Sequence, residues 1–373
     1  MRIPFFSWLF LVSMCTLFLK FYVFMVSSQC LGNQQSLLLE LKSNLIFNST
    51  MSTKLAHWNQ SVDCCSWEGV TCNGGHVIAL DLTNESISSE LDNSSILFSL
   101  QHLQSLSLAC NDFQYSQIPS EFYKLRNLSY LNLSNAALEG QIPIAISRLT
   151  RLVILDLSIN ALYLENPNLN VLVQNLSRLM ELYLDEVSIS AQGNEWCQAL
   201  SSLLPNLRVL SLSNCNLSGP IDSSLRNLQS LSIIRLNDNN FSTPVPDFFA
   251  NFKNLTSLHL SNSELNGKFP EKIFQVPTLE MVDLSFNELL EGSLPEFPPN
   301  GSLRTMVLSY TKFSGTLPHS IGNLKMLSTI KLQECKFNGS IPSSMAGLTQ
   351  LVYLDMSFNS LSGSLPIFSM CKN

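Results

Sequence analysis

The chain has 373 residues, of which 45% are apolar and only 13% are charged, and its formal net charge is −7. This composition excludes a disordered chain, which has few apolar residues and a high net charge. Acidic residues outnumber basic ones 28 to 21, which excludes a polybasic protein, so no nucleic-acid partner is expected.

Residues 1–28 have the features of a secretory signal peptide. Arg2 is followed by an apolar stretch over residues 3–26, interrupted by Lys20, and the small residues Ser27 and Ser28 suit cleavage. We expect cleavage after Ser28, and the alternative is an uncleaved signal anchor. No later run approaches the roughly 20 apolar residues of a spanning helix, so we expect no transmembrane segment. Both alternatives place the protein in the secretory pathway.

Asparagine-linked glycosylation motifs also agree with export. Asn-x-Ser/Thr occurs at Asn48, Asn59, Asn84, Asn93, Asn127, Asn132, Asn175, Asn216, Asn240, Asn254, Asn300 and Asn338. The repeat described below favours Asn-Leu-Ser and so generates some of these motifs, which means that not all need carry a glycan.

We assign residues 29–76 to a small N-terminal cap. A helix is expected from Asn33, with leucines 38, 41 and 45 on one face. Nine cysteines remain after the signal peptide, and the cap holds Cys30, Cys64, Cys65 and Cys72. Because no second Cys/His pair completes a zinc pattern, we expect disulfides and no metal. Four cysteines allow three pairings.

From residue 77 onward the chain repeats the pattern Leu-x-x-Leu-x-Leu-x-x-Asn. After a degenerate opening unit at 77–82, the starts are Leu103, Leu128, Leu152, Leu179, Leu207, Leu231, Leu255, Leu279, Leu303, Leu327 and Leu351. The spacings are 25, 24, 27 and 28 residues, then 24 six times in a row. This predicts a leucine-rich-repeat solenoid of about 12 repeats over residues 77–373.

Each position of the repeat has a physical role. In residues 351–356, Leu354 and Met356 point inward while Tyr353 and Asp355 point outward, so stacked strands form a concave parallel sheet. The asparagine that follows pairs backbone groups of adjacent coils. It is present at Asn111, Asn160, Asn239, Asn287 and Asn359. Cys215 and Cys335 fill the same position, where a weak S–H donor can partly replace the amide.

The second half of the unit reads Gly-x-Ile-Pro, as in residues 339–342, and this form resembles the plant-specific class of leucine-rich repeats over residues 77–366. The expected fold class is therefore an α/β solenoid of plant-specific repeats, a right-handed superhelix with a concave parallel sheet and a disulfide-stapled N-terminal cap. At the 24-residue spacing the next repeat would open at residue 375, and Cys371 stands alone without a capping partner. We therefore expect the front part of a longer array without a C-terminal cap, and the alternative is a natural short secreted form.

Residues 64–72 (Cys-Cys-Ser-Trp-Glu-Gly-Val-Thr-Cys) resemble the N-terminal cap of plant leucine-rich-repeat receptors. Residues 195–207, 210–215 and 363–366 resemble the ectodomain of plant receptor-like proteins of the Verticillium-wilt-resistance type. The first resemblance implies the pairings Cys30–Cys64 and Cys65–Cys72. The second implies a plasma-membrane receptor without a kinase, which senses pathogen proteins in the apoplast and signals through partner receptor kinases. The sequence departs from the family because the later repeats, the membrane span and the cytoplasmic tail are missing.

No catalytic pattern is present. The five histidines are scattered, and there is no phosphate-binding glycine loop or kinase signature. We expect neither an enzyme nor a cofactor.

The outward positions of the strands form the expected binding face. Its central column reads Ser107, Asn132, Asp156, Tyr183, Ser211, Arg235, His259, Asp283, Val307, Lys331 and Asp355. Tyrosine and arginine carry much of the energy of protein interfaces. The candidate ligand-binding residues are Glu181, Tyr183, Asp185, Arg235, Asp238, His259, Tyr310, Lys331 and Tyr353. Phe286 and Phe358 share the position before the asparagine, where they either pack between coils or face a ligand.

Two repeats are overlong, with extra residues near 162–170 and 188–196. They form either a partner-contact loop or a bulge stapled by a Cys197–Cys215 disulfide.

The leading hypothesis is an extracellular module that recognises a pathogen-derived protein or peptide and works with a co-receptor kinase. The alternatives are a secreted inhibitor of a pathogen cell-wall hydrolase, similar to polygalacturonase inhibitors, and a non-functional truncated product.

Overall fold

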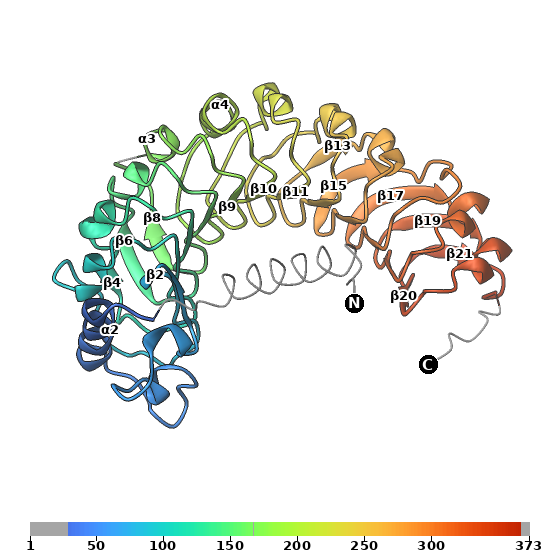
Figure 1. The fold of residues 1–373 in the computed structure, drawn as a ribbon. Coiled ribbons are helices and arrows are strands. Elements are labelled where there is room, and N and C mark those ends of the chain that lie inside the picture. The colour runs from blue at the N-terminus through green and yellow to red at the C-terminus, as the bar shows by residue number, and fades with distance from the viewer. Residues whose placement is uncertain (1–28, 167, 367–373) are drawn as a thin grey trace, which may run out of the picture.

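The computed structural model describes residues 29–166 and 168–366, which form a curved solenoid (Figure 1). Each coil places one strand on the inner, concave side of the arc, and the helices lie on the outer side. The predicted fold class is confirmed. The predicted signal peptide and the region around Cys371 lie outside the described residues. Within the described residues, no helix is both long enough and apolar enough to cross a membrane.

The concave sheet contains thirteen strands of the described chain, and they follow one another in sequence order. An antiparallel pair, β1 (Val70–Asn73) and β2 (His76–Asp81), opens the sheet, and every later pairing is parallel. The later strands are β3 (Ser105–Ser107), β5 (Tyr130–Asn132), β7 (Ile154–Asp156), β9 (Glu181–Tyr183), β10 (Val209–Ser211), β11 (Ile233–Arg235), β12 (Ser257–His259), β14 (Met281–Asp283), β16 (Thr305–Val307), β18 (Thr329–Lys331) and β20 (Tyr353–Asp355).

The sheet register aligns the predicted central column. Arg235 pairs with His259, His259 with Asp283, and Val307 with Lys331. The middle residue of each strand points into the coil, as Leu258 does with no exposed surface. Strand alternation and a constant repeat length together fix this arrangement.

Two smaller parallel sheets lie on the side of the solenoid, where each coil turns away from the concave face. One contains β4 (Ser116–Gln117), β6 (Leu138–Gln141) and β8 (Ala161–Tyr163). The other contains β13 (Asn266–Lys268), β15 (Asn287–Gly292), β17 (Thr311–Thr316), β19 (Lys336–Ser340) and β21 (Ser360–Ser362).

The convex side carries short 3-10 helices in most coils and α-helices in the two overlong repeats. The 3-10 helices of the array are Ile96–Ser99, Ser120–Lys124, Ile146–Arg148, Ser223–Asn227, Asp247–Asn251, Glu271–Gln275, His319–Asn323 and Ser343–Gly347. The overlong repeats contain α3 (Leu169–Val173) and α4 (Gly193–Leu203). The extra residues therefore lengthen the convex segment into helices, and α4 buries Trp196 against the core.

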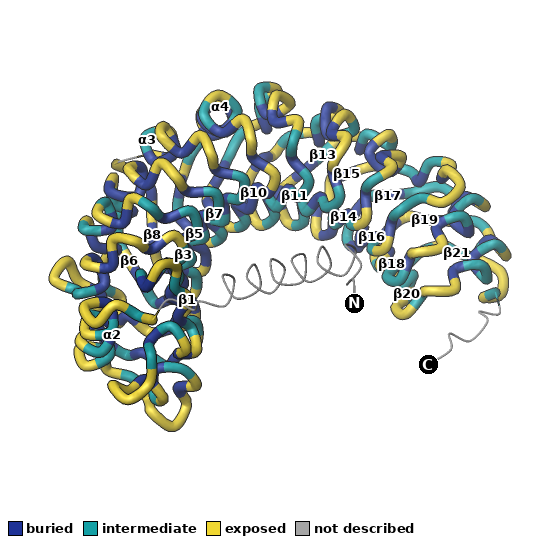
Figure 2. The backbone as a smooth tube through the Cα atoms, in the orientation of Figure 1, coloured by how far each residue is buried: buried dark blue, intermediate teal, exposed yellow. Residues whose placement is uncertain are grey.

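The core runs continuously through the coils, as the buried positions in Figure 2 show. Asn287 illustrates how the buried turns are held together. Its Oδ1 accepts hydrogen bonds from the backbone N–H groups of Ser263 and Leu265 in the preceding coil. Its Nδ2 donates to the carbonyls of Leu260 and Leu284, so one side chain pairs two coils.

The two buried cysteines in the asparagine position act as the sequence predicts. The Sγ of Cys215 lies 3.0 Å from the carbonyl oxygen of Leu184, and that of Cys335 lies 3.1 Å from the carbonyl oxygen of Leu308. A thiol offers one weak donor, so it satisfies a carbonyl of the preceding coil but not the set of groups that an asparagine pairs.

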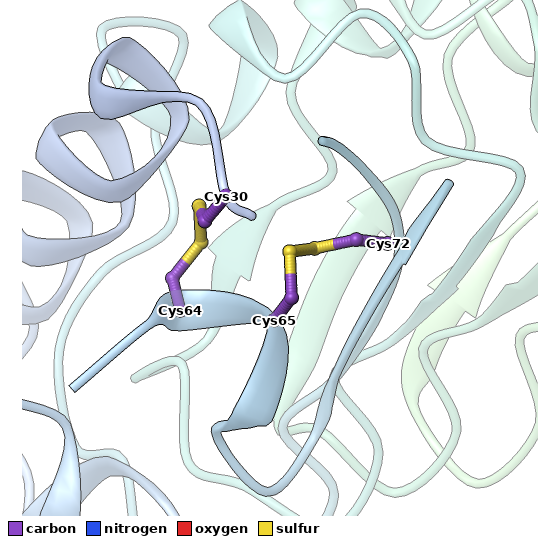
Figure 3. Close-up of side chains that lie close together, drawn as sticks. All are labelled: Cys30, Cys64, Cys65 and Cys72. Atoms are coloured by element: carbon purple, nitrogen blue, oxygen red, sulfur yellow. A yellow bond between two sulfur atoms is a disulfide. The ribbon is translucent and has the colours of Figure 1, made fainter. Parts of the chain in front are cut away.

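The N-terminal cap contains α2 (Gly32–Asn44) and the 3-10 helices Leu55–His57 and Cys64–Ser66. Disulfides join Cys30 to Cys64 and Cys65 to Cys72 (Figure 3), the pairing that the family resemblance implies. The rings of Trp58 and Trp67 stack with centroids 5.1 Å apart. These features hold together a segment too short to build a large core of its own.

Glu85 joins the cap to the first coil. It occupies the asparagine position of that coil, is fully buried, and faces the cap. Its carboxylate accepts hydrogen bonds from the hydroxyl of Ser52 and from the backbone N–H groups of Lys54 and Leu55. Burial acts to raise the pKa of Glu85, but these hydrogen bonds outweigh it and hold the pKa below its ordinary value.

Candidate functional site

A groove of about 740 Å³ lies on the concave sheet between β12 and β20. We call it the concave groove. Its floor contains the outward residues of the strands, among them Met281, Asp283, Thr305 and Lys331, and its side is formed by the turns that follow them. Most of its lining comes from positions that the repeat leaves free of core packing, although Val307, Ser285 and Ser309 are buried. Much of its chemistry can therefore vary without affecting the fold.

Phe286 and Tyr310 form an aromatic surface in the concave groove. Their rings stack with centroids 4.7 Å apart and an interplanar angle of 11°. Phe286 is 55% exposed although it is a large apolar side chain. The hydroxyl of Tyr310 accepts a hydrogen bond from Nε2 of Gln333 in the next coil at 3.1 Å, which fixes the ring.

Both aromatic residues have left-handed backbone conformations, with φ of 57° at Phe286 and 60° at Tyr310. The same turn position is left-handed along the array, and asparagine, which tolerates this conformation, fills it at Asn84, Asn135, Asn214 and Asn262. Other residues, such as Ile159, Glu186 and Glu334, also take this conformation at the same position, so it belongs to the repeat. What distinguishes Phe286 and Tyr310 is that their rings stack across adjacent coils.

The C-terminal end of the concave groove carries a cation and an aromatic ring. The Nζ of Lys331 lies 5.2 Å from the ring centroid of Tyr353, within the range of a cation–π contact. Asp355 is beside them, and hydrogen bonds from Ser357 hold its pKa below the ordinary value. At the other end, the carboxylate of Asp238 accepts a hydrogen bond from Asn262 at 2.8 Å.

The structure divides the predicted site residues into two sets. Asp238, Tyr310, Lys331 and Tyr353 line the concave groove. The other predicted residues (Glu181, Tyr183, Asp185, Arg235 and His259) lie on or next to the preceding strands β9–β12 of the same face, outside the groove.

Glu181, Tyr183 and Asp185 of the second set make internal hydrogen bonds. The hydroxyl of Tyr183 donates to Glu181 at 2.8 Å, and burial together with this carboxylate raises the pKa of Tyr183. Asp185 accepts from the hydroxyl of Ser211 and from the backbone N–H of Ser213. These contacts hold the three side chains in place on the concave face beside the groove.

His259 also belongs to the second set. Its Nε2 lies 2.8 Å from the hydroxyl of Ser257. Burial and the neighbouring positive charge of Arg235 both lower the pKa of His259, while Asp283 opposes them. The ring is therefore kept neutral near pH 7.

The sequence alone leaves the role of Phe286 open and assigns none to Met281 or Thr305, which also line the groove. Phe286 contacts the next coil, yet more than half of its surface remains exposed. The sequence signal that could have drawn attention to it is the presence of aromatic residues at this turn position in two adjacent coils, Phe286 and Tyr310.

The alternative disulfide between Cys197 and Cys215 is not formed, and both residues are free and buried. Cys197 lies on α4 on the convex side, whereas the thiol of Cys215 points at the carbonyl of Leu184 at the concave turn. The two thiols therefore lie at opposite ends of the coil. Burial raises the pKa of both thiols, which makes them unreactive.

Among the described residues, the one cluster with the donor atoms for a metal ion is that of Cys30, Cys64, Cys65 and Cys72. All four cysteines are committed to disulfides, so the cluster does not fit a metal.

Asn132 is the glycosylation motif that lies on the concave strands, well before the groove begins at β12. A glycan there would leave the concave groove open.

Comparison with known proteins gives a family and a fold. The family model described as "Leucine-rich repeat region" matches residues 76–295, and the model described as "Leucine rich repeat N-terminal domain" matches residues 31–73. Receptor-like protein 6 of Arabidopsis thaliana is 33% identical over 84% of this chain and 29% of that protein. Receptor-like protein EIX1 of Solanum lycopersicum is 33% identical over 54% of this chain and 21% of that protein. The chain thus spans less than a third of these relatives.

Solved structures agree on the fold. The ectodomain of the Arabidopsis receptor kinase HAESA, in complex with an IDA peptide hormone, matches with a TM-score of 0.76 and 28% identity over 91% of this chain and 59% of that one. The PEPR1–AtPEP1 structure matches with a TM-score of 0.64 and 29% identity over 90% and 46%. A plant ice-binding protein matches with a TM-score of 0.61 and 26% identity over 91% and 98%. One fold therefore serves different functions, and the site must decide between them.

Proposed function

The chain belongs to the leucine-rich-repeat family, and on that premise we propose that it is the extracellular recognition module of a plant receptor-like protein. It binds a peptide, or an extended segment of a protein, in the concave groove. The observation that carries this proposal is the stacked pair Phe286–Tyr310, which exposes an aromatic surface inside that groove.

The groove has the composition of a recognition site. It combines an apolar platform with separated charges at Asp238, Asp283 and Lys331 and with hydroxyl groups such as that of Thr305. Interfaces concentrate their energy in aromatic and cationic side chains of this kind. His259, next to the groove, is hydrogen-bonded to the hydroxyl of Ser257 on its own strand.

The similar proteins support a peptide ligand and a co-receptor. HAESA is described in complex with the IDA peptide and the co-receptor SERK1. By analogy, the ligand of this chain would join it to a receptor kinase, and the relatives named as receptor-like proteins favour a location at the cell surface. That the ligand comes from a pathogen, as the family resemblance implies, belongs to the same proposal.

Selection from a peptide library tests the proposal although the ligand is unidentified. The secreted chain is immobilised and panned against random dodecapeptides displayed on phage, in parallel with the double variant Phe286→Asn and Tyr310→Asn. We expect wild-type protein to enrich a family of related peptides and the variant to lose at least tenfold of that binding. Absence of enrichment, or equal enrichment by both proteins, contradicts peptide recognition in this groove.

The same protein preparation also tests the second candidate function, which is inhibition of a cell-wall hydrolase. An inhibitor of cell-wall hydrolases would lower the activity of a fungal polygalacturonase at equimolar protein. Our proposal expects no such inhibition, because the charges that line the concave groove are separated and of both signs, which suits an extended peptide better than the surface of a folded enzyme.

A further inference from the structure

A second, smaller groove adjoins the concave groove at its side. It has a volume of about 450 Å³ and is lined by Ser242, Asn262, Glu264, Phe286, Glu288 and Leu289, among others. We call it the rim groove. Phe286 and Asn262 line both grooves, so the two are continuous over the edge of the concave sheet.

The rim groove combines exposed apolar surface with negative charge. Phe286 is 55% exposed and Leu289 is 58% exposed. Glu264 and Glu288 occupy the same position in adjacent coils, and neither belongs to an ion pair within the described part of the chain. Glu264 accepts a hydrogen bond from the hydroxyl of Ser242 at 2.6 Å, which holds its carboxylate at the groove.

The sign of the charge reverses along the same side of the solenoid. In the next two coils the position of Glu288 is filled by Lys312 and Lys336. The negative surface is thus limited to two coils, next to Phe286. In the other direction the position is filled by Asn240 and Asn216, both in glycosylation motifs, which would border the rim groove.

We infer that the bound segment crosses the edge of the sheet at Phe286 and carries lysine or arginine where it lies in the rim groove. This rests on the proposed function and narrows its ligand to an extended, locally basic peptide. The aliphatic stem of a basic side chain packs on Phe286 and Leu289 while its charged end reaches Glu264 or Glu288. Lys312 disfavours basic residues beyond that point, so the basic part is short.

The peptides selected from the dodecapeptide library test this inference by their composition. In the selected peptides we expect lysine and arginine to occur next to an aromatic residue several-fold more often than in the unselected library. One selected peptide, synthesised and labelled, is then titrated against the wild type and the double variant Glu264→Gln and Glu288→Gln. Its affinity should fall roughly fivefold, since each exposed ion pair contributes modestly, and the remaining affinity should lose most of its dependence on salt.

Glu139→Gln is the matched control, because Glu139 is an exposed glutamate on β6, in the other side sheet. It should leave the affinity unchanged, and Lys312→Glu should raise it by extending the negative surface. Enrichment without a basic bias, or an equal effect of the control, overturns the inference while leaving peptide recognition intact. Failure to enrich any peptide overturns both.

Discussion

Phe286 stacks on Tyr310 from the neighbouring coil, and both residues adopt left-handed backbone conformations. For a residue with a Cβ this conformation costs about 1–2 kcal/mol. Asn262, one coil earlier, shows the residue that would avoid most of that cost. Every coil is left-handed at this position, and these two adjacent coils place aromatic residues there, whose stacked rings line the concave groove.

Replacing Phe286 by asparagine should separate stability from binding. Relief of backbone strain of about 1 kcal/mol opposes the loss of an exposed ring stack of about 0.5–1.5 kcal/mol. We therefore expect the free energy of unfolding to change by less than about 1 kcal/mol, while binding of selected peptides falls at least tenfold. Urea denaturation and peptide titration of the same preparation measure both. A large loss of stability would show that Phe286 is a packing residue.

Much of the concave face could be predicted from the sequence because two periods determine it, the strand alternation and the repeat length. The strand alternation and the 24-residue spacing place Lys331 and Tyr353 on the concave face before any contact is seen. The repeat does not reveal how overlong coils fold, so the sequence does not predict α3 and α4. It also does not reveal which outward side chains bond to each other, and so Tyr183 could not be distinguished from Tyr310.

Removal of the Asn287 side chain should destabilise the array strongly. Asn287→Ala leaves the buried N–H groups of Ser263 and Leu265 without acceptors, at a cost of about 2–4 kcal/mol. Cys335→Ala is the matched comparison, because Cys335 fills the same position and its thiol is a weak donor to one carbonyl, and we expect about 1 kcal/mol. Equal losses in denaturant unfolding would contradict the role given to the asparagine amide.

Thiol labelling should distinguish the free cysteines of the described residues. Cys110 is exposed, whereas Cys197, Cys215 and Cys335 are buried and have raised pKa values. In native protein at pH 8 we expect an alkylating reagent to modify Cys110 within minutes and the buried thiols only after unfolding in urea. Mass spectrometry of the peptides reports the sites. A peptide pair joined through Cys197 and Cys215 before reduction would refute this assignment.

Lowering the pH should detach the cap from the first coil, because the carboxylate of Glu85 becomes protonated. Because the pKa of Glu85 is lowered in the folded protein, the unfolded cap binds a proton more readily than the folded one. Its contribution to stability is therefore complete above the ordinary pKa of 4.5 and is lost as the pH falls through the lower folded value. Fluorescence of the stacked Trp58 and Trp67 reports opening of the cap during a titration from pH 7 to pH 3.

Glu85→Gln should remove this acid transition and weaken the cap at neutral pH. Glutamine lacks the negative charge and presents an N–H group to donors such as the backbone N–H of Leu55, so we expect a loss of about 2 kcal/mol. Glu68→Gln is the control, because Glu68 is an exposed glutamate of the cap. It should keep the wild-type stability and the wild-type acid transition. If both variants retain the acid transition, Glu85 does not control the junction between the cap and the array. The residue that would then account for the transition is Asp81, whose carboxylate pairs with Lys54 of the cap at 2.9 Å.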